Sequence, residues 1–220
     1  MPMGVGLYAS YGSWSRADGA GEKHTWTSRG QGHAVPVDWE KIERDRARKA
    51  AERAEKTAAT AKEAARLLAS ATPATDRHPY LVRKQVQPHG ALIDRAGRLL
   101  LPIHSLAGEL LGLQYILPPD GAAKPYLKGT DRKTPGCFII GDTAGAAIVA
   151  VVEGFATGAS VHEATGWPVV VSFDKNGLEK IAAPLRTMLP DVLLVFAGDN
   201  DENQAGQEAA GKAADAAGGV

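Results

Sequence analysis

The sequence predicts an α/β fold whose C-terminal part is a parallel sheet with helices on its faces. Three apolar runs, AAIVAVVE, WPVVVSF and DVLLVFAGD, have the length and composition of strands that are buried on both faces. A helical segment follows each run: GFATGASVHEATG, NGLEKIAAPLRTML and ENQAGQEAAGKAADAA. Three strand–helix units in succession imply crossover connections and one parallel sheet. The chain ends directly after the third helix, where another strand would continue the pattern, as expected of a piece of a longer protein.

Composition places the chain among ordinary globular proteins. Hydrophobic residues make up 44% of the 220 positions, and 25 basic residues balance 25 acidic ones, so the net charge does not indicate a polyanionic partner. The single cysteine, Cys137, excludes an intrachain disulfide and a cysteine-cluster zinc site, and we expect it in a strand core. The chain shows neither a signal peptide nor an apolar run near the roughly 20 residues of a membrane helix. We therefore expect a cytoplasmic protein without a membrane partner.

The first third of the chain is predicted to contain little core. Residues 1–36 are rich in Gly, Ser and Trp, which is typical of an irregular N-terminal arm. Residues 37–72 are dominated by Ala, Glu, Lys and Arg, the strongest helix formers, and begin with a plausible N-cap at Asp38. Large apolar residues are almost absent from the middle of this segment. This pattern favours a long charged helix that acts as a spacer over a basic surface for nucleic acid.

Between residues 73 and 145 the hydrophobic period changes and predicts a small antiparallel unit. HPYLVRK begins a short helix. GRLLLPIHSL and ELLGLQYIL form two strands around a turn at Ala107 and Gly108. PYLKGTD and GCFIIGD are predicted as two further short strands.

Acidic residues stand where each predicted parallel strand ends. Glu153 follows the first strand, Asp174 follows the second, and Asp199 and Asp201 follow the third. Because the carboxyl ends of parallel strands meet at one edge of a sheet, we expect these side chains to lie close together. Clustered carboxylates repel each other unless a divalent cation neutralises them, and oxygen ligands suit Mg²⁺ or Mn²⁺. Each acid alone could be a solvated loop residue or an N-cap, but together they predict a metal centre for phosphoryl transfer.

This arrangement resembles the Toprim domain, in which a Glu ends one strand and an Asp-x-Asp ends another two strand–helix units later. The resemblance covers residues 146–217, with Glu153 in VVEGFATGAS and Asp199 and Asp201 in AGDND. It implies that the two aspartates bind Mg²⁺ or Mn²⁺, while Glu153 binds metal or works as a general acid or base. Asp174 is a further candidate metal acid. The family includes bacterial-type primases, type IA and type II topoisomerases, and some nucleases.

The preceding segment resembles the small basic subdomain that comes before Toprim in bacterial-type primases. The strand pair GRLLLPIHSLAGELLGLQYI and the stretch KPYLKGTDRKTPGCFIIGD carry this likeness. EGFATGASVHEATGWPVVVSFDKNGL looks similar to the primases or primase-helicases of plasmids, phages and mobile elements. Residues 73–145 would then be a basic primase-like subdomain, and residues 146–220 the Toprim domain. The likeness implies that six basic residues contact template phosphates and nucleoside triphosphate. These residues are Arg98, Lys124, Lys128, Arg132, Lys133 and Lys175. The alternative is that they are ordinary surface charges.

The resemblance implies the catalytic core of a DNA primase, which joins nucleotides on single-stranded DNA. A replicative helicase, separate or fused, is a further candidate partner, and no zinc is expected in this chain. Two alternatives stay open: a Toprim nuclease that hydrolyses phosphodiesters with the same acids, and a non-catalytic nucleic-acid-binding module of a replication protein. Retention of all three acids disfavours the last, since a pure binding module gains nothing from clustered like charges.

Overall fold

A computed structural model of the chain describes residues 8–12, 23–27, 38–198 and 205–220. By its internal contacts the chain divides into two units, residues 1–49 and residues 50–220. In the first unit, β1 (Tyr8–Gly12) and β2 (Lys23–Thr27) form an antiparallel pair. None of the described helices is long and apolar enough to cross a membrane.

The predicted charged segment is one continuous helix, α1 (Trp39–Ala69). Asp38 caps it as expected, because its carboxylate accepts a hydrogen bond of 2.8 Å from the backbone N–H of Lys41. Only the C-terminal part of α1 contributes to a core: Ala64 is fully buried, and Leu67 and Leu68 pack beside it against the following sheet. The preceding turns carry charged side chains that are largely exposed, as a solvated helix should.

The segment that follows α1 folds mainly into antiparallel strands. In chain order its elements are β3 (Thr72–Pro73), α2 (Pro79–Lys84), β4 (Leu92–Ile93), β5 (Leu99–Ser105), β6 (Leu110–Ile116) and β7 (Gly136–Ile140). The predicted pair β5 and β6 is confirmed, with the turn at Gly108. PYLKGTD, however, is not a continuous strand: it makes one isolated bridge, between Tyr126 and Gln114, and a few further backbone hydrogen bonds to β6, such as that from the Leu127 N–H to the Leu113 carbonyl at 2.9 Å.

The remaining chain alternates strands and helices as predicted. Its elements are β8 (Ile148–Val152), α3 (Phe155–Thr165), β9 (Val169–Val171), α4 (Lys175–Met188), β10 (Leu193–Ala197) and α5 (Ala205–Ala217). Strands β10, β8 and β9 are parallel neighbours, and β7 joins β9 in antiparallel orientation. Through β7 and β5, both halves share one eight-stranded sheet in the order β10-β8-β9-β7-β5-β4-β3, with β6 paired to β5. The predicted α/β class is therefore confirmed.

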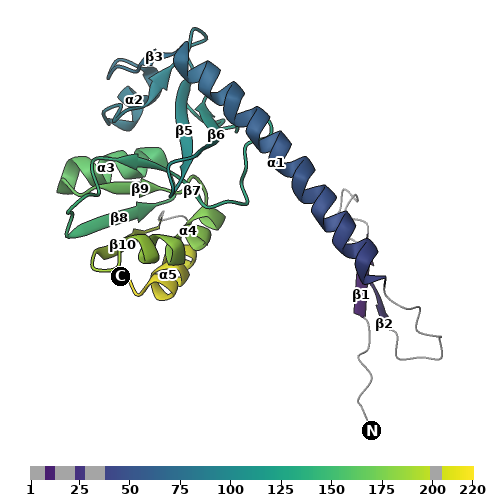
Figure 1. Cartoon of the computed structure of the whole chain (residues 1–220). Helices are drawn as coiled ribbons and strands as arrows, with labels where there is room; N and C mark the ends of the chain where they lie inside the picture. Colours follow the sequence, from purple (N-terminus) through teal and green to yellow (C-terminus); the bar gives the residue numbers. More distant parts are fainter. Residues whose placement is uncertain (1–7, 13–22, 28–37, 199–204) are drawn as a thin grey trace. The chain divides into compact units, whose positions relative to one another are not determined.

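The parallel strands bury both faces, as their continuous apolar runs predict. In β8, Ala150 and Val152 pack toward α3, whereas Val149 and Val151 pack toward α4 and α5. Figure 1 shows α3 on one side of these strands and the other two helices on the opposite side. Cys137 in β7 is buried at 1% exposure, and burial raises the pKa of its thiol to about 11. Its predicted place in a strand core is confirmed.

One arginine ties the ends of α4 and α5 together. The guanidinium of Arg186 donates hydrogen bonds of 2.7–2.9 Å to four backbone carbonyls, at Ala217, Leu189, Pro190 and Val192. These bonds satisfy carbonyl groups near the C-terminal ends of both helices, which have no partner within a helix. The side chain thus closes the turn after α4, where Leu189 and Val192 also pack against the core.

We expect Arg186→Ala to lower the free energy of unfolding by about 2 kcal/mol, because it leaves partly buried carbonyls without donors. Urea denaturation followed by circular dichroism would measure the change. Lys212→Ala, at an exposed position of α5, is the matched control and should stay within about 0.5 kcal/mol of the parent protein. Equal effects of the two substitutions would contradict the role given to Arg186.

Candidate active site

Three parallel strands end side by side at one edge of the sheet. The register pairs Val152, the last residue of β8, with Ala197 of β10 and with Val171 of β9. Glu153 follows β8 directly, and its side chain is half-buried. Asp199 and Asp201, which follow β10 in the sequence, lie outside the described residues. Among the described residues, no group of three or more His, Cys, Asp or Glu side chains is close enough together to hold a metal ion.

Glu153 lines a cleft of about 280 Å³ between the two halves of the sheet. The opposite wall comes from the segment after β6, with Lys124, Tyr126 and Arg132. The remaining lining residues come from β6, from the start of α3 and from the loop after β9: Gln114, Gly154, Phe155, Phe173 and Asp174. Two acids, Glu153 and Asp174, and two cations therefore share one open cleft, in which the cations could bind an anionic ligand beside a carboxylate.

Asp174 stands at the centre of a polar network on the floor of this cleft. One carboxylate oxygen caps α4 by accepting the backbone N–H of Gly177 at 2.9 Å. The other oxygen accepts the hydroxyl of Tyr126 at 3.1 Å and is paired with the guanidinium of Arg132. Although burial opposes it, the Gly177 N–H and the Arg132 and Tyr126 side chains hold the pKa of Asp174 below its usual value. Asp174 is therefore ionised at neutral pH.

Tyr126 and Arg132 stack on each other beside Asp174. The guanidinium carbon of Arg132 lies 4.4 Å from the centroid of the Tyr126 ring, and the Phe173 ring meets Tyr126 edge-on at 6.5 Å. Burial, together with the charge and hydrogen bond of Asp174, raises the pKa of Tyr126 to about 12. Phe173 itself has a φ of 73°, a left-handed conformation that is uncommon for an aromatic residue. The hydroxyl of Tyr126 thus stays a hydrogen-bond donor.

Two polar side chains that line the cleft were not among the predicted site residues. Tyr126 and Gln114 are joined by the bridge described above, and Gln114 is only 5% exposed. A sequence signal for Gln114 exists, since it is a polar residue at a buried position of the apolar strand LLGLQYI. Tyr126 carries no such signal because its partners lie far away in the chain.

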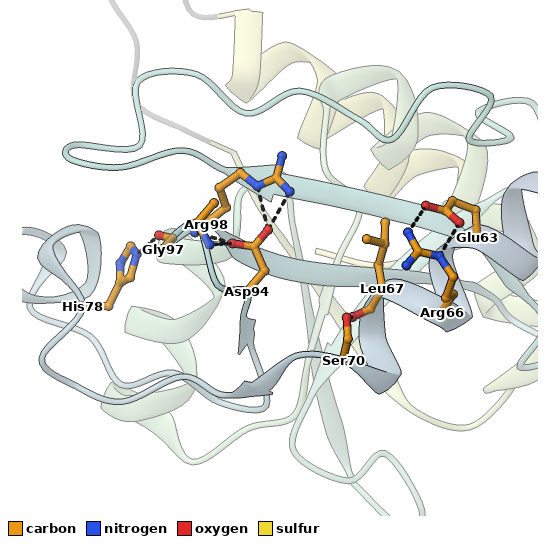
Figure 2. A network of polar contacts seen from close by, with 9 residues as sticks. Glu63, Arg66, Leu67, Ser70, His78, Asp94, Gly97 and Arg98 are labelled. Carbon is orange, nitrogen blue, oxygen red and sulfur yellow. Dashed lines mark hydrogen bonds and ion pairs between the residues drawn. The ribbon is translucent and has the colours of Figure 1, made fainter.

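Arg98 lies in a separate network, at the turn between β4 and β5 (Figure 2). Its Nε donates a 2.7 Å hydrogen bond to Asp94, whose other oxygen accepts the backbone N–H of Arg98 at 3.0 Å. The Arg98 guanidinium also lies 4.5 Å from the centroid of the Tyr115 ring. Next to this pair, His78 contacts the carbonyl of Gly97 at 2.9 Å. Arg98 is thus held locally and is not part of the lining described for the Glu153 cleft.

The four predicted lysines are all exposed but do not gather at one point. Lys124 lines the cleft, with its Nζ 5.9 Å from the centroid of the Tyr80 ring. Lys175 begins α4 directly after Asp174, whereas Lys128 and Lys133 flank Arg132 in the segment before β7. Of the predicted basic residues, the structure therefore brings Lys124 and Arg132 into the described lining of the Glu153 cleft.

A protein-family model described as the Toprim domain matches residues 148–219, from β8 to the residues after α5. These are the strands and helices that carry Glu153 and the Asp-x-Asp segment. Residues 148–219 are thus similar to the Toprim domain. The antiparallel strands and the basic side of the cleft lie upstream of this match.

Curated relatives extend the likeness beyond the Toprim domain. Two proteins named DNA primase TraC, both from Escherichia coli, are 35% and 36% identical over 212 and 182 residues. The matches cover 89% and 78% of this chain. They cover 14% and 17% of the relatives, so the chain spans a small part of their length.

A solved structure from bacteriophage T7 gives a weaker match. It shows the lagging-strand DNA polymerase interacting with primase domains of two gp4 subunits bound to an RNA/DNA hybrid and dTTP. The alignment has a TM-score of 0.49 and 19% sequence identity, and it covers 64% of this chain and 74% of that chain.

Proposed function

We propose that this chain is the catalytic core of a DNA primase, which synthesises short primers on single-stranded DNA by metal-dependent nucleotidyl transfer. The supporting observation is that the similarity to the two TraC primases spans 89% and 78% of the chain, well beyond the Toprim domain. The upstream segment supplies Lys124 and Arg132 to the cleft of Glu153. A shared fold alone would not argue for one activity, so the proposal rests on the sequence similarity across both segments.

The proposed metal centre uses Glu153, Asp199 and Asp201. Glu153 stands at the end of β8, and the two aspartates follow its parallel neighbour β10 in the sequence. An all-carboxylate donor set fits Mg²⁺ or Mn²⁺, which would stabilise negative charge on the reacting phosphate when bound. Glu153 would either hold the ion or accept the proton of the attacking 3′-hydroxyl. The structure provides this acid with a half-buried position beside an open cleft.

The reaction joins the 3′-hydroxyl of one nucleotide to the α-phosphate of the next. The hydroxyl oxygen forms the new P–O bond, the bond to the β-phosphate breaks, and pyrophosphate leaves. In this scheme Arg132 and Lys124 bind the triphosphate, and Lys175 contacts it at the edge of the site. Arg98, Lys128 and Lys133 would contact template phosphates at a greater distance from the cleft. Single-stranded DNA and nucleoside triphosphates are then the direct partners, with a replicative helicase as a further one.

Incorporation of labelled nucleoside triphosphates on single-stranded DNA tests this function. The protein would be incubated with template, all four ribonucleotides and Mg²⁺ or Mn²⁺, and the products separated by size. We expect short labelled products that disappear when a chelator is added. Metal-dependent cleavage of the template without new products would replace the primase by a nuclease. DNA binding without either reaction would replace it by a binding module.

A further inference from the structure

The contacts of Asp174 leave little room for its predicted role as a metal ligand. Both carboxylate oxygens are engaged: one caps α4 through Gly177, and the other holds Tyr126 and Arg132. The carboxylate thereby joins the loop after β9 to a loop more than 40 residues earlier in the chain. An acid that already satisfies a helix end, a phenol and a guanidinium acts as a structural link more readily than as a cation ligand.

Arg132 is fixed to α4 at two points. Its side chain is paired with Asp174, the N-cap of that helix, and its backbone carbonyl accepts a 2.8 Å hydrogen bond from Nζ of Lys180. The guanidinium carbon also lies over the Tyr126 ring, 4.4 Å from its centroid. The Arg132 side chain is still 53% exposed, so other N–H donors of its five remain open to solvent.

We propose that Asp174 is a positioning residue, which holds Arg132 against Tyr126 so that the free N–H donors of the guanidinium meet the phosphates of an incoming nucleoside triphosphate. This role rests on the proposed function, because it assumes that the cleft of Glu153 receives a triphosphate. Arg132, Tyr126 and Asp174 all line that cleft. An arginine that is already immobilised loses less side-chain freedom when a ligand binds, so fixing it in advance strengthens binding.

Whether nucleotide binding becomes weaker or stronger when Asp174 loses its charge separates this role from simple charge neutralisation. If Asp174 only neutralised Arg132, removing its charge would strengthen the attraction between the cleft and a triphosphate. If it positions Arg132, removing the charge releases the guanidinium and weakens binding. Asp174→Asn suits this test because asparagine caps helices about as well as aspartate, so α4 keeps its first turn. Its amide NH₂ group would then face Tyr126 and Arg132 and could not pair with the guanidinium.

A double-mutant cycle on nucleotide binding provides the measurement. Binding of ATP with a fluorophore on its ribose would be followed by anisotropy in Mg²⁺ for the whole chain, Asp174→Asn, Arg132→Ala and the double variant. We expect Kd to rise about tenfold for Arg132→Ala and about fivefold for Asp174→Asn, as for the loss of a charge-assisted hydrogen bond. The double variant should bind no more weakly than Arg132→Ala, because Asp174 acts through Arg132. Tyr126→Phe, which keeps the stacked ring, should change Kd only about twofold.

Control variants and a second readout exclude a mere loss of structure. Glu63 and Arg66 form an exposed ion pair on α1, and Glu63→Gln with Arg66→Ala should leave Kd unchanged. Asp174→Asn should lower the urea midpoint, because its bonds to Arg132 and Tyr126 are lost, but the variant should still unfold in one cooperative transition and be fully folded without urea. In the primer-synthesis assay, Asp174→Asn should raise KM for the nucleotide while kcat stays within about twofold.

Four outcomes decide the matter. Non-additive losses of nucleotide affinity support the positioning role. If they occur in a protein that makes no primers, the proposed function fails but the nucleotide site stands. Additive losses overturn it, since Asp174 would then act independently of Arg132. Tighter binding by Asp174→Asn overturns it in favour of charge neutralisation. Absence of nucleotide binding by the parent protein also overturns it.

Discussion

We expect the replacement of Asp199 and Asp201 together by asparagine to lower nucleotide incorporation by at least about a thousandfold. The amide side chains keep nearly the same size but lose the negative charges that would hold Mg²⁺ or Mn²⁺ beside Glu153. Without the ion, charge that develops on the reacting phosphate loses its metal partner, and losses of this size follow from removing such electrostatic stabilisation. The rate of primer synthesis at saturating nucleotide measures the effect.

The fold should survive this double substitution. Clustered carboxylates repel each other in the absence of metal, so removing two charges relieves repulsion and leaves the urea midpoint equal or higher. Asp191 is exposed just before β10, at the opposite end of the same strand, and Asp191→Asn is the matched control. Full activity in the double variant, or an equal loss in Asp191→Asn, would contradict the assignment of the metal centre.

The second large effect is expected from a single added methyl group at Gly177. A Cβ atom at this position would lie 2.1 Å from the backbone oxygen of Ser172, closer than any real contact. Gly177 lies in the first turn of α4, and its N–H completes the cap at Asp174. The methyl group would force α4 away from the end of β9. We therefore expect Gly177→Ala to lower the free energy of unfolding by about 3 kcal/mol or more.

At Gly211 in α5, the same change from glycine to alanine is expected to stabilise the fold rather than destabilise it. A Cβ atom there would meet nothing within 4 Å. Alanine favours an open helical position over glycine, so Gly211→Ala should raise the free energy of unfolding by about 0.5–1 kcal/mol. Urea denaturation of the two variants in parallel tests both signs. A stabilising effect at Gly177 would mean that α4 and β9 do not approach as closely as the structure has them.

Sequence pattern predicts the parallel half of the sheet well because the burial of its strands is visible in the residues. Val149, Val151 and Val170 pack toward α4 and α5, and their neighbours in the strands pack toward α3, so every strand position must be apolar. The same logic places Glu153 at a strand end. Such periodicity is a local property, and a single sequence displays it directly.

The contacts of the cleft could not be predicted in the same way. Asp174 meets Arg132 and Tyr126 across separations of 42 and 48 residues, and nothing local in the sequence marks these partners. The segment around Tyr126 has a strand-like composition, but it forms only one isolated bridge to β6. A position at a strand end therefore suggested a metal ligand at Asp174, whereas tertiary contacts give its carboxylate other partners.

Template-directed incorporation on homopolymeric single-stranded DNA tests the central claim most directly. Each of the four ribonucleotides would be offered in turn, with Mg²⁺ or Mn²⁺, to templates made only of dT or only of dC. We expect ATP to be incorporated on the first template and GTP on the second, with no product from the Asp199→Asn/Asp201→Asn variant. Incorporation that does not depend on the template sequence, or that persists in the double variant, would contradict a primase core whose metal centre uses these acids.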